Sequence, residues 1–309
     1  MRKLVYAVFA MLLFSVPCSA KPNIKYALAV YHYNLQYVAG DSKVEGRIIK
    51  YGFDPMLDFF LRHPNWGGDL EMQGYMLDAL AERAPETLEK LRTLANRGQI
   101  DVVSFHYSDQ LFLAYPAHDM YWSARLNDEA FKRHNVKRSN VVFTQEGQYG
   151  EGMAPLMKGH GQNILILPKN LYRYWQGEQT AAPYYKVRGA EVMLSSRDVK
   201  YDDEHANIDV HWTFCDDGEL LPTNRATPYS EHYQYRPEAM AKYESELEAL
   251  EKDGYRIGKI SDYMREVKAA GVQPSVLKAA PDGTWQPDDT ENVFRWMGDH
   301  VGQHERDYL

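Results

Sequence analysis

Residues 208–219 read Ile-Asp-Val-His-Trp-Thr-Phe-Cys-Asp-Asp-Gly-Glu. Apolar and polar side chains alternate through the first part of this stretch, which is the period-2 pattern of a half-buried strand. Gly218 ends the predicted strand, so Asp216, Asp217 and Glu219 fall at its carboxyl end. In barrel enzymes the carboxyl ends of the strands carry the chemistry, because rigid backbone aims their side chains into a cleft. The alternative interpretation is a solvated acidic turn.

Similar apolar segments recur along the chain, and helical patterns separate several of them. The predicted strands are residues 26–31, 101–105, 140–144, 163–167, 190–195, 208–214 and 256–260. The clearest helical signals are Asp54-Pro55, Ala84-Pro85 and the Glu-, Ala- and Leu-rich residues 237–252. Strands that alternate with helices indicate one α/β domain with a parallel sheet, closed as a barrel or open.

The first twenty residues have the pattern of a secretory signal peptide. Arg2 and Lys3 form a basic start, residues 4–16 are mostly apolar, and residues 18–20 are small. The apolar run is too short for a stable membrane span. We therefore expect residues 21–309 to form an exported, soluble bacterial domain, periplasmic or secreted, with no membrane span after cleavage.

Composition narrows the possible partners. Cys215 is the only cysteine after residue 20, which excludes an internal disulfide and a cysteine-based zinc site. The formal net charge is -8 and no basic stripe is present, so nucleic acid is not an expected partner. The chain contains 23 Tyr and 6 Trp, whose flat rings suit sugar faces as well as protein cores.

Polar clusters follow several of the predicted strands. They are residues 32–34, 106–109, 145–146 and 216–219, and each contains a histidine or a carboxylate. If the strands are parallel, all of these clusters lie on one rim of the sheet. A single polar strand end is usually a capped loop, but the coincidence of several favours a functional site.

Glu146 and Asp217 are the two carboxylates best placed for catalysis. Residues 143–151 read Phe-Thr-Gln-Glu-Gly-Gln-Tyr-Gly-Glu, and glycines near a carboxylate allow a ligand to approach closely. Two carboxylates across a cleft can perform glycoside hydrolysis, and the proton donor needs a raised pKa, which Phe214 and Cys215 would provide by desolvation. The alternative is a flexible loop with solvated glutamates. No metalloprotease, nucleophile-elbow, phosphate-loop or dinucleotide motif is present.

These residues resemble motifs of glycoside hydrolase family 57 and, secondarily, of the family 38 α-mannosidases, which share a (β/α)7 barrel. Residues 98–104, Gly-Gln-Ile-Asp-Val-Val-Ser, are similar to the family 57 segment Gly-Gln-x-Glu-x-x-Ser, and Asp109 matches the substrate-contacting acid that ends that segment. Residues 217–219 resemble the Asp-Gly-Glu motif, which implies an acid/base role for Asp217 and a supporting role for Glu219. His32 resembles the first histidine of the His-x-His-Gln-Pro motif, which lines the glycone subsite.

Glu146 falls where family 57 places its glutamate nucleophile, after a central strand and before a helix. Glu151 is the competing candidate, because it stands nearer to Pro155, the predicted helix start. We prefer Glu146 because it directly ends the strand and its spacing to Pro155 resembles that in family 38. Residues 282–285, Asp-Gly-Thr-Trp, are similar to the family segment Asp-Gly-Ser-Trp, in which the tryptophan (here Trp285) borders the substrate site.

The resemblance implies a retaining glycoside hydrolase or transglycosidase that acts on α-linked sugars and needs no metal or cofactor. Glu146 would be the nucleophile and Asp217 the acid/base, with carboxyl groups about 5–5.5 Å apart. The expected partner is an oligo- or polysaccharide substrate. The implied substrate-binding residues are His32, His106, Asp109, Glu219 and Trp285.

The chain departs from the family pattern at several positions. Asn34 replaces the second histidine of the first motif, and Gln110 stands where a proline is usual. The chain also stops soon after Trp296, where family members usually continue into a helical bundle. The expected fold is therefore a distorted (β/α)7-type parallel barrel, a single catalytic domain without most of that bundle.

Two other functions are compatible with the same residues. Residues 213–218 resemble the Thr-Phe-Asp-Asp-Gly motif of metal-dependent polysaccharide deacetylases, although an extra residue interrupts the motif. A family 38-like metal site would need His32, Glu146 and His211 around zinc. The other alternative is a non-catalytic carbohydrate-binding envelope protein that has kept the barrel but does not turn over substrate.

Overall fold

The structure is a computed structural model that describes residues 23–36, 41–108, 111, 115–177, 181–195, 201, 203–278 and 283. The predicted signal peptide of residues 1–20 and the predicted substrate-binding residues Asp109 and Trp285 lie outside these ranges. Within them, no helix combines the length and the apolar character that a membrane crossing requires.

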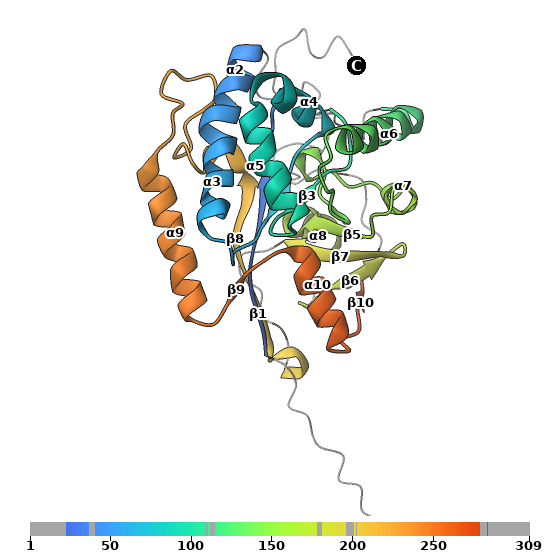
Figure 1. The fold of residues 1–309 in the computed structure, drawn as a ribbon. Coiled ribbons are helices and arrows are strands. Elements are labelled where there is room, and N and C mark those ends of the chain that lie inside the picture. Colours follow the sequence, from blue (N-terminus) through green and yellow to red (C-terminus); the bar gives the residue numbers. More distant parts are fainter. Residues whose placement is uncertain are drawn as a thin grey trace, which may run out of the picture.

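β1 (Ile24–His32) is the central strand of the first sheet, and every strand of that sheet runs parallel to it (Figure 1). β8 (Ile208–Asp217) pairs with β1 along its whole length. β2 (Asp69–Glu71) and β9 (Arg256–Ile257) also pair with β1, and β3 (Asp101–Val103) adds beyond β2. The carboxyl ends of β1, β2 and β8 therefore meet at one rim.

The second sheet has the strand order β10-β6-β7-β5-β4. Its strands are β4 (Val141–Val142), β5 (Ile164–Pro168), β6 (Tyr185–Val187), β7 (Ala190–Ser195) and β10 (Ser275–Val276). Among these strands, the β6–β7 hairpin is antiparallel and the other pairs are parallel. A parallel bridge between Val102 and Arg138 joins β3 to the segment that leads into β4, so the two sheets form one distorted barrel.

Helices lie on the outside of the strands (Figure 1). They are α2 (Ser42–Arg47), α3 (Asp54–Arg62), α4 (Gly74–Arg83), α5 (Pro85–Asn96), α6 (Ala117–Arg133), α7 (Met153–Gly159), α8 (Lys169–Gln176), α9 (Pro237–Lys252) and α10 (Ile260–Ala269). A π-helix, η1 (Ile48–Phe53), joins α2 to α3, and short 3-10 turns occur at η3 (Gln145–Gly147), η4 (Asp203–His205) and η5 (Gly218–Leu220). The predicted starts at Asp54-Pro55 and Ala84-Pro85 are confirmed, since proline occupies the first turn of α3 and α5.

All the predicted strands are present, and the predicted (β/α)7-type barrel is confirmed. Three strands of the described chain, β2, β6 and β10, were not predicted from the sequence. β2 is the one that lies beside β1. It is only Asp69-Leu70-Glu71, with two acids and one apolar residue, and so it lacks an apolar run. Its place is decided by backbone pairing to β1 and β3 on either side, which no local pattern reports.

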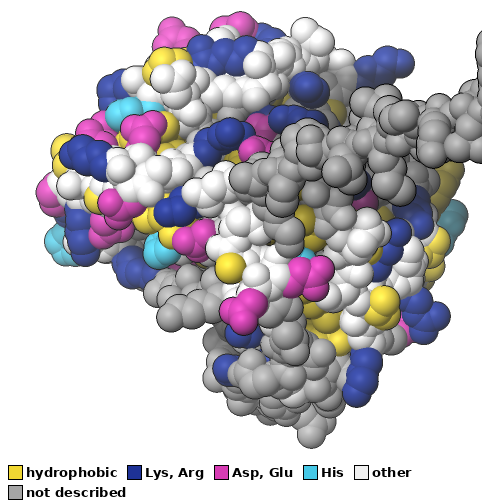
Figure 2. Space-filling view, turned by 90° about the horizontal axis from the view of Figure 1, so that it is seen from below, with side chains coloured by type: hydrophobic (Ala, Val, Ile, Leu, Met, Phe, Trp, Pro, Cys, Tyr) yellow, Lys and Arg dark blue, Asp and Glu magenta, His cyan; other side chains and the backbone are white. Residues whose placement is uncertain are grey.

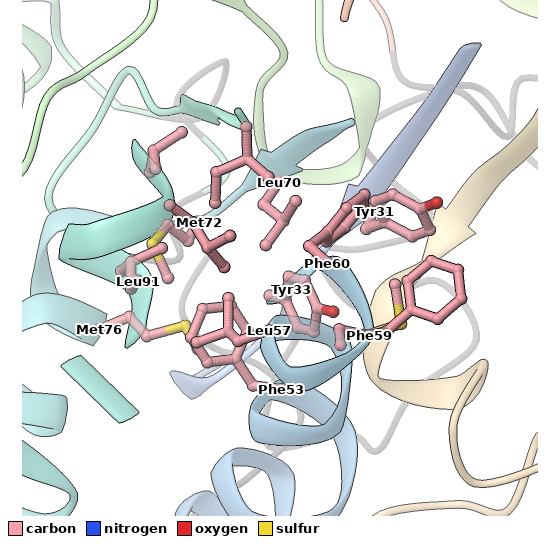
Figure 3. Packing of buried hydrophobic residues seen from close by; sticks show 14 of the residues in the cluster. Tyr31, Tyr33, Phe53, Leu57, Phe59, Phe60, Leu70, Met72, Met76 and Leu91 are labelled. Atoms are coloured by element: carbon pink, nitrogen blue, oxygen red, sulfur yellow. The ribbon is translucent and has the colours of Figure 1, made fainter. Parts of the chain in front are cut away.

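Two hydrophobic layers cover the two faces of β1. Leu28 and Val30 belong to the cluster inside the barrel, together with residues of β4, β5 and β8. Tyr31 and Tyr33 face outward and pack against residues of η1 and α3, as Figure 3 shows for Phe53, Leu57 and Phe60. His32, at the end of β1, has the parity of the inward residues. On the face of the molecule seen in Figure 2, acidic and basic side chains are interspersed.

Candidate active site

A β-bulge in β8 decides which acid faces the barrel. β1 and β8 stay in register up to Leu28 and Trp212, after which Ala29 pairs with Phe214, so Thr213 is the extra residue. The bulge reverses the facing of every later side chain. Phe214 consequently stacks outside on Tyr31, with ring centroids 5.3 Å apart. The predicted alternation through Phe214 is therefore wrong after Trp212.

The reversed register places Asp217, and not Asp216, inside. His32 pairs with Asp217 across the two strands, so both side chains point to the barrel interior. Asp216 faces outward, where its Oδ2 accepts a hydrogen bond of 2.8 Å from Arg225, a residue with a largely exposed side chain. A strand without the bulge would have brought Asp216 beside His32.

A chain of hydrogen bonds connects Asp217 to Glu146 through two amides. Asn34 Nδ2 donates to Asp217 Oδ1 at 2.9 Å, and Asn34 Oδ1 accepts from Gln145 Nε2. Gln145 Nε2 also donates to Glu146 Oε1 at 3.3 Å. Asn34 and Gln145 are almost fully buried, so these amides are held in a fixed orientation. We call this chain the amide relay. It brings the two predicted catalytic carboxylates into one site.

Gln73, the residue before α4, holds Gln145 of the amide relay in place. Its Nε2 donates to Gln145 Oε1 at 3.2 Å and to the carbonyl oxygen of Tyr33 at 3.0 Å. Sequence reasoning missed Gln73. It placed Asn34 and Gln145 in the polar clusters at the rim but gave neither of them a role in the site. Neutral amides carry no catalytic signature in a sequence, and only the contact with the carboxylates identifies them.

Glu146 occupies a strained backbone conformation. Its φ and ψ are 54° and 29°, in the left-handed region that few residues other than glycine adopt. Glu146 is 4% exposed. The turn is closed by a hydrogen bond from the backbone NH of Gly147 to the carbonyl oxygen of Thr144. A strained backbone conformation persists only where the surrounding structure holds it in place. Here the turn directs the Glu146 carboxylate toward Gln145. Glu151, the competing nucleophile, is 41% exposed and forms an ion pair with Arg188.

His32 and His106 differ in charge: His32 is protonated and His106 is neutral. Burial alone would lower the pKa of His32, but the charge and hydrogen bond of Glu71, with the charges of Glu146 and Asp217, raise it to about 10. Burial lowers the pKa of His106 to about 4, and the positive charge of His32 adds to this effect. His106 is therefore neutral: its Nδ1 donates to the carbonyl oxygen of Ser108, and its Nε2 accepts from the backbone NH of Gln145 at 3.1 Å.

Burial raises the pKa of Asp217, as a general acid requires. The negative charge of Asp216 acts in the same direction. The positive charge of His32, the hydrogen bond from Asn34 and the charge of Arg225 lower the pKa and limit the shift. The predicted desolvation by Cys215 is compatible with its inward position beside the barrel cluster, whereas Phe214 lies on the outer face.

Glu219 lies behind Asp217 and is 1% exposed. Burial, followed by the negative charge of Asp217, raises the pKa of Glu219 well above its ordinary value. Gly218 allows the tight turn between these acids, because a Cβ there would lie 2.9 Å from both Tyr31 Cβ and Tyr33 Cζ. This close approach gives a physical reason for glycine in the Asp-Gly-Glu motif.

The predicted residues divide into those that the structure brings together and those that it does not. His32, His106, Glu146, Asp217 and Glu219 converge at one rim. His211 is exposed in the middle of β8, with its ring against Tyr255, so the family 38-like metal set is not assembled. In the described part of the chain, no three His, Cys, Asp or Glu side chains form a group that could hold a metal ion.

Comparisons with known proteins show which sequences and folds this chain resembles. No protein-family model matches the chain. Alpha-amylase 1 of Dictyoglomus thermophilum is 27% identical over 132 residues, which are 42% of this chain and 17% of that protein. The chain thus spans less than a fifth of the length of this relative.

Two solved structures have a similar fold. A GH57-type branching enzyme from Pyrococcus horikoshii has a TM-score of 0.63 and 12% identity, over 90% of this chain and 76% of that one. A suggested polysaccharide deacetylase from Mycobacterium smegmatis has a TM-score of 0.55 and 11% identity, over 84% of this chain and 96% of that one. With the amylase, the branching enzyme confirms the predicted resemblance to family 57 glycoside hydrolases.

Proposed function

We propose that this protein is an exported retaining glycoside hydrolase or transglycosidase that acts on α-linked glucans. The observation that carries the proposal is the amide relay, which joins a partly exposed Asp217 of raised pKa to the buried Glu146. Two carboxylates in one site, in different environments, match the requirements of glycoside hydrolysis. The similarity to an alpha-amylase and a branching enzyme supports the choice of an α-glucan as the substrate class.

The proposed reaction has two steps. The Glu146 carboxylate attacks the anomeric carbon while Asp217 donates its proton to the departing glycosidic oxygen, so one C–O bond forms as the other breaks. Asp217, now ionised, then takes a proton from water or from an acceptor sugar hydroxyl, which displaces Glu146. Net configuration at the anomeric carbon is retained. His32 would orient the sugar beside the pair. His106, whose two ring nitrogens bond to Ser108 and Gln145, and the buried Glu219 would support the pair from within the protein.

The proposal is tested by incubating the mature chain with amylose and with a panel of aryl α-glycosides, and by following the anomeric signals by NMR. We expect bond cleavage with the α-anomer formed first. Formation of the β-anomer first would exclude the retaining mechanism. Release of acetate from acetylated polysaccharides, dependent on added metal, would support the deacetylase alternative. Binding of amylose without turnover would support the non-catalytic carbohydrate-binding alternative.

Arg225→Gln should raise the pH at which activity declines on the alkaline side. A general acid works while it is protonated, so activity falls as pH rises through the pKa of Asp217. Removing Arg225 removes a charge that lowers this pKa and also leaves Asp216 unpaired. The shift should be below about one pH unit, because the Arg225 side chain is 64% exposed and its charge is screened.

The measurement is the alkaline limb of kcat/KM against pH at low ionic strength. Arg265→Gln is the matched control, because Arg265 pairs with Asp262 on α10 and its side chain is 73% exposed. A downward shift for Arg225→Gln, or an equal shift in both variants, would contradict the assignment of the limb to Asp217.

A further inference from the structure

Glu71 is a buried carboxylate that the proposed reaction does not use. It is the last residue of β2, and its side chain is fully buried. The β1–β2 register pairs Glu71 with His32, and the β1–β8 register pairs His32 with Asp217. Side chains at paired positions of neighbouring parallel strands point to the same face. Glu71, His32 and Asp217 therefore form a row across three strands on the inner face of the barrel.

The contact between Glu71 and His32 is a direct hydrogen bond. Glu71 Oε2 lies against His32 Nδ1, so the imidazole presents its Nε2 edge away from Glu71. The ring is also held edge-on to Phe143, with centroids 5.8 Å apart. The other carboxylate oxygen, Glu71 Oε1, is buried and has no hydrogen-bond partner among the described residues. A buried glutamate with one bonded oxygen is costly, and within the same residues its bonding partner is His32.

The titratable groups that face His32 come from several elements. Glu71 faces it from β2, Asp217 from β8, Glu146 from η3 and Glu219, whose pKa is raised, from η5. His106, which is neutral, faces it from the loop after β3. With burial opposing protonation and three carboxylates favouring it, the pKa of His32 rises to about 10.

We propose that Glu71 is a positioning residue that keeps His32 as an imidazolium ion between Glu146 and Asp217. This inference rests on the proposed function for its catalytic meaning, but not for the charge state itself. One fixed cation at this place reduces the repulsion between the two catalytic carboxylates, which otherwise would favour protonation of Glu146. It also stabilises the ionised form of Asp217 that follows proton transfer. Glu71 acts only through His32 and is not expected to touch the substrate.

The test is a pH titration of the histidine side chains by NMR, on protein with labelled imidazole nitrogens. In the wild type, His32 should carry both ring protons at pH 8, while His106 should be neutral. In Glu71→Gln, the loss of the adjacent negative charge should lower the pKa of His32 by about 1–3 units. Glu45→Gln is the matched control, since Glu45 is another buried glutamate, 7% exposed, that is paired elsewhere with Arg83.

Activity supplies a second and separable measurement. At pH values above the lowered pKa of His32, its charge is lost and no longer lowers the pKa of Asp217, so there Glu71→Gln should extend activity on the alkaline limb of kcat/KM to higher pH and reduce kcat more than it changes KM. A neutral His32 at pH 8 in the wild type overturns the inference even if Glu71→Gln does not fold. Identical His32 titrations in wild type and Glu71→Gln overturn it as well. A charged His32 in a protein without glycosidase activity would refute only the proposed function.

Discussion

Asp217→Asn should lower kcat on polymeric α-glucans by about 10²–10⁴-fold, the usual contribution of a general acid. The same variant should lose much less activity on aryl α-glycosides whose leaving group departs without protonation. The fold should be unaffected, because the side-chain carbonyl of asparagine can still accept the hydrogen bond from Asn34. The measurement is kcat on amylose and on 4-nitrophenyl α-glycosides for both proteins.

Glu146→Gln is the partner variant, and it should lose activity on both kinds of substrate. No leaving group compensates for an absent nucleophile, because the glycosyl-enzyme cannot form. Glutamine keeps an oxygen that can accept from Gln145 Nε2, so the amide relay is preserved. Glu151→Gln is the control and should retain activity, since Glu151 is paired with Arg188. Equal losses of Asp217→Asn on the two substrate types would remove Asp217 from the acid/base role, and full activity of Glu146→Gln would remove the nucleophile.

Gly52→Ala should destabilise the protein by about 1–3 kcal/mol through overpacking. A Cβ at this position in η1 would lie 2.6 Å from the Tyr233 hydroxyl oxygen and 2.8 Å from Glu219 Cβ. It would also lie 2.9 Å from Glu219 Cα, which is backbone and cannot rotate away. The turn that carries Asp217 and Glu219 must shift, so activity should fall together with stability. Denaturant unfolding and kcat of the folded fraction are the measurements.

Gly46→Ala provides the matched control in the preceding helix. Gly46 lies in α2, and a Cβ added there would have no heavy atom within 4 Å. Replacement of a helical glycine by alanine at an open position is expected to stabilise by about 1 kcal/mol. Similar unfolding free energies for the two variants would show that η1 and η5 do not press together as the structure indicates.

Local sequence patterns were sufficient to predict most strands and helices, but not the contacts that define the site. The apolar segments of β1, β5 and β8 and the proline starts of α3 and α5 each depend on neighbouring residues alone, and each was predicted. The rim positions of His32 and Glu146 followed from the expectation that parallel strands end together. Glu71 and Gln73, and the role of Gln145 within its predicted rim cluster, could not be predicted, because they depend on contacts across separate strands and loops.

The sequence by itself determined an α/β domain with a parallel sheet and acids at the carboxyl end of a strand near residue 217, because period-2 alternation and terminating glycines act over a few residues. The closed barrel was implied by the resemblance to family 57. Only the tertiary structure decided which acid enters the site. The bulge at Thr213 depends on pairing with β1, and Thr213 Oγ1 is held by the Leu28 carbonyl oxygen and the Tyr243 hydroxyl. A single extra residue inverts the facing of a strand, so Asp217 meets His32 while Asp216 faces Arg225.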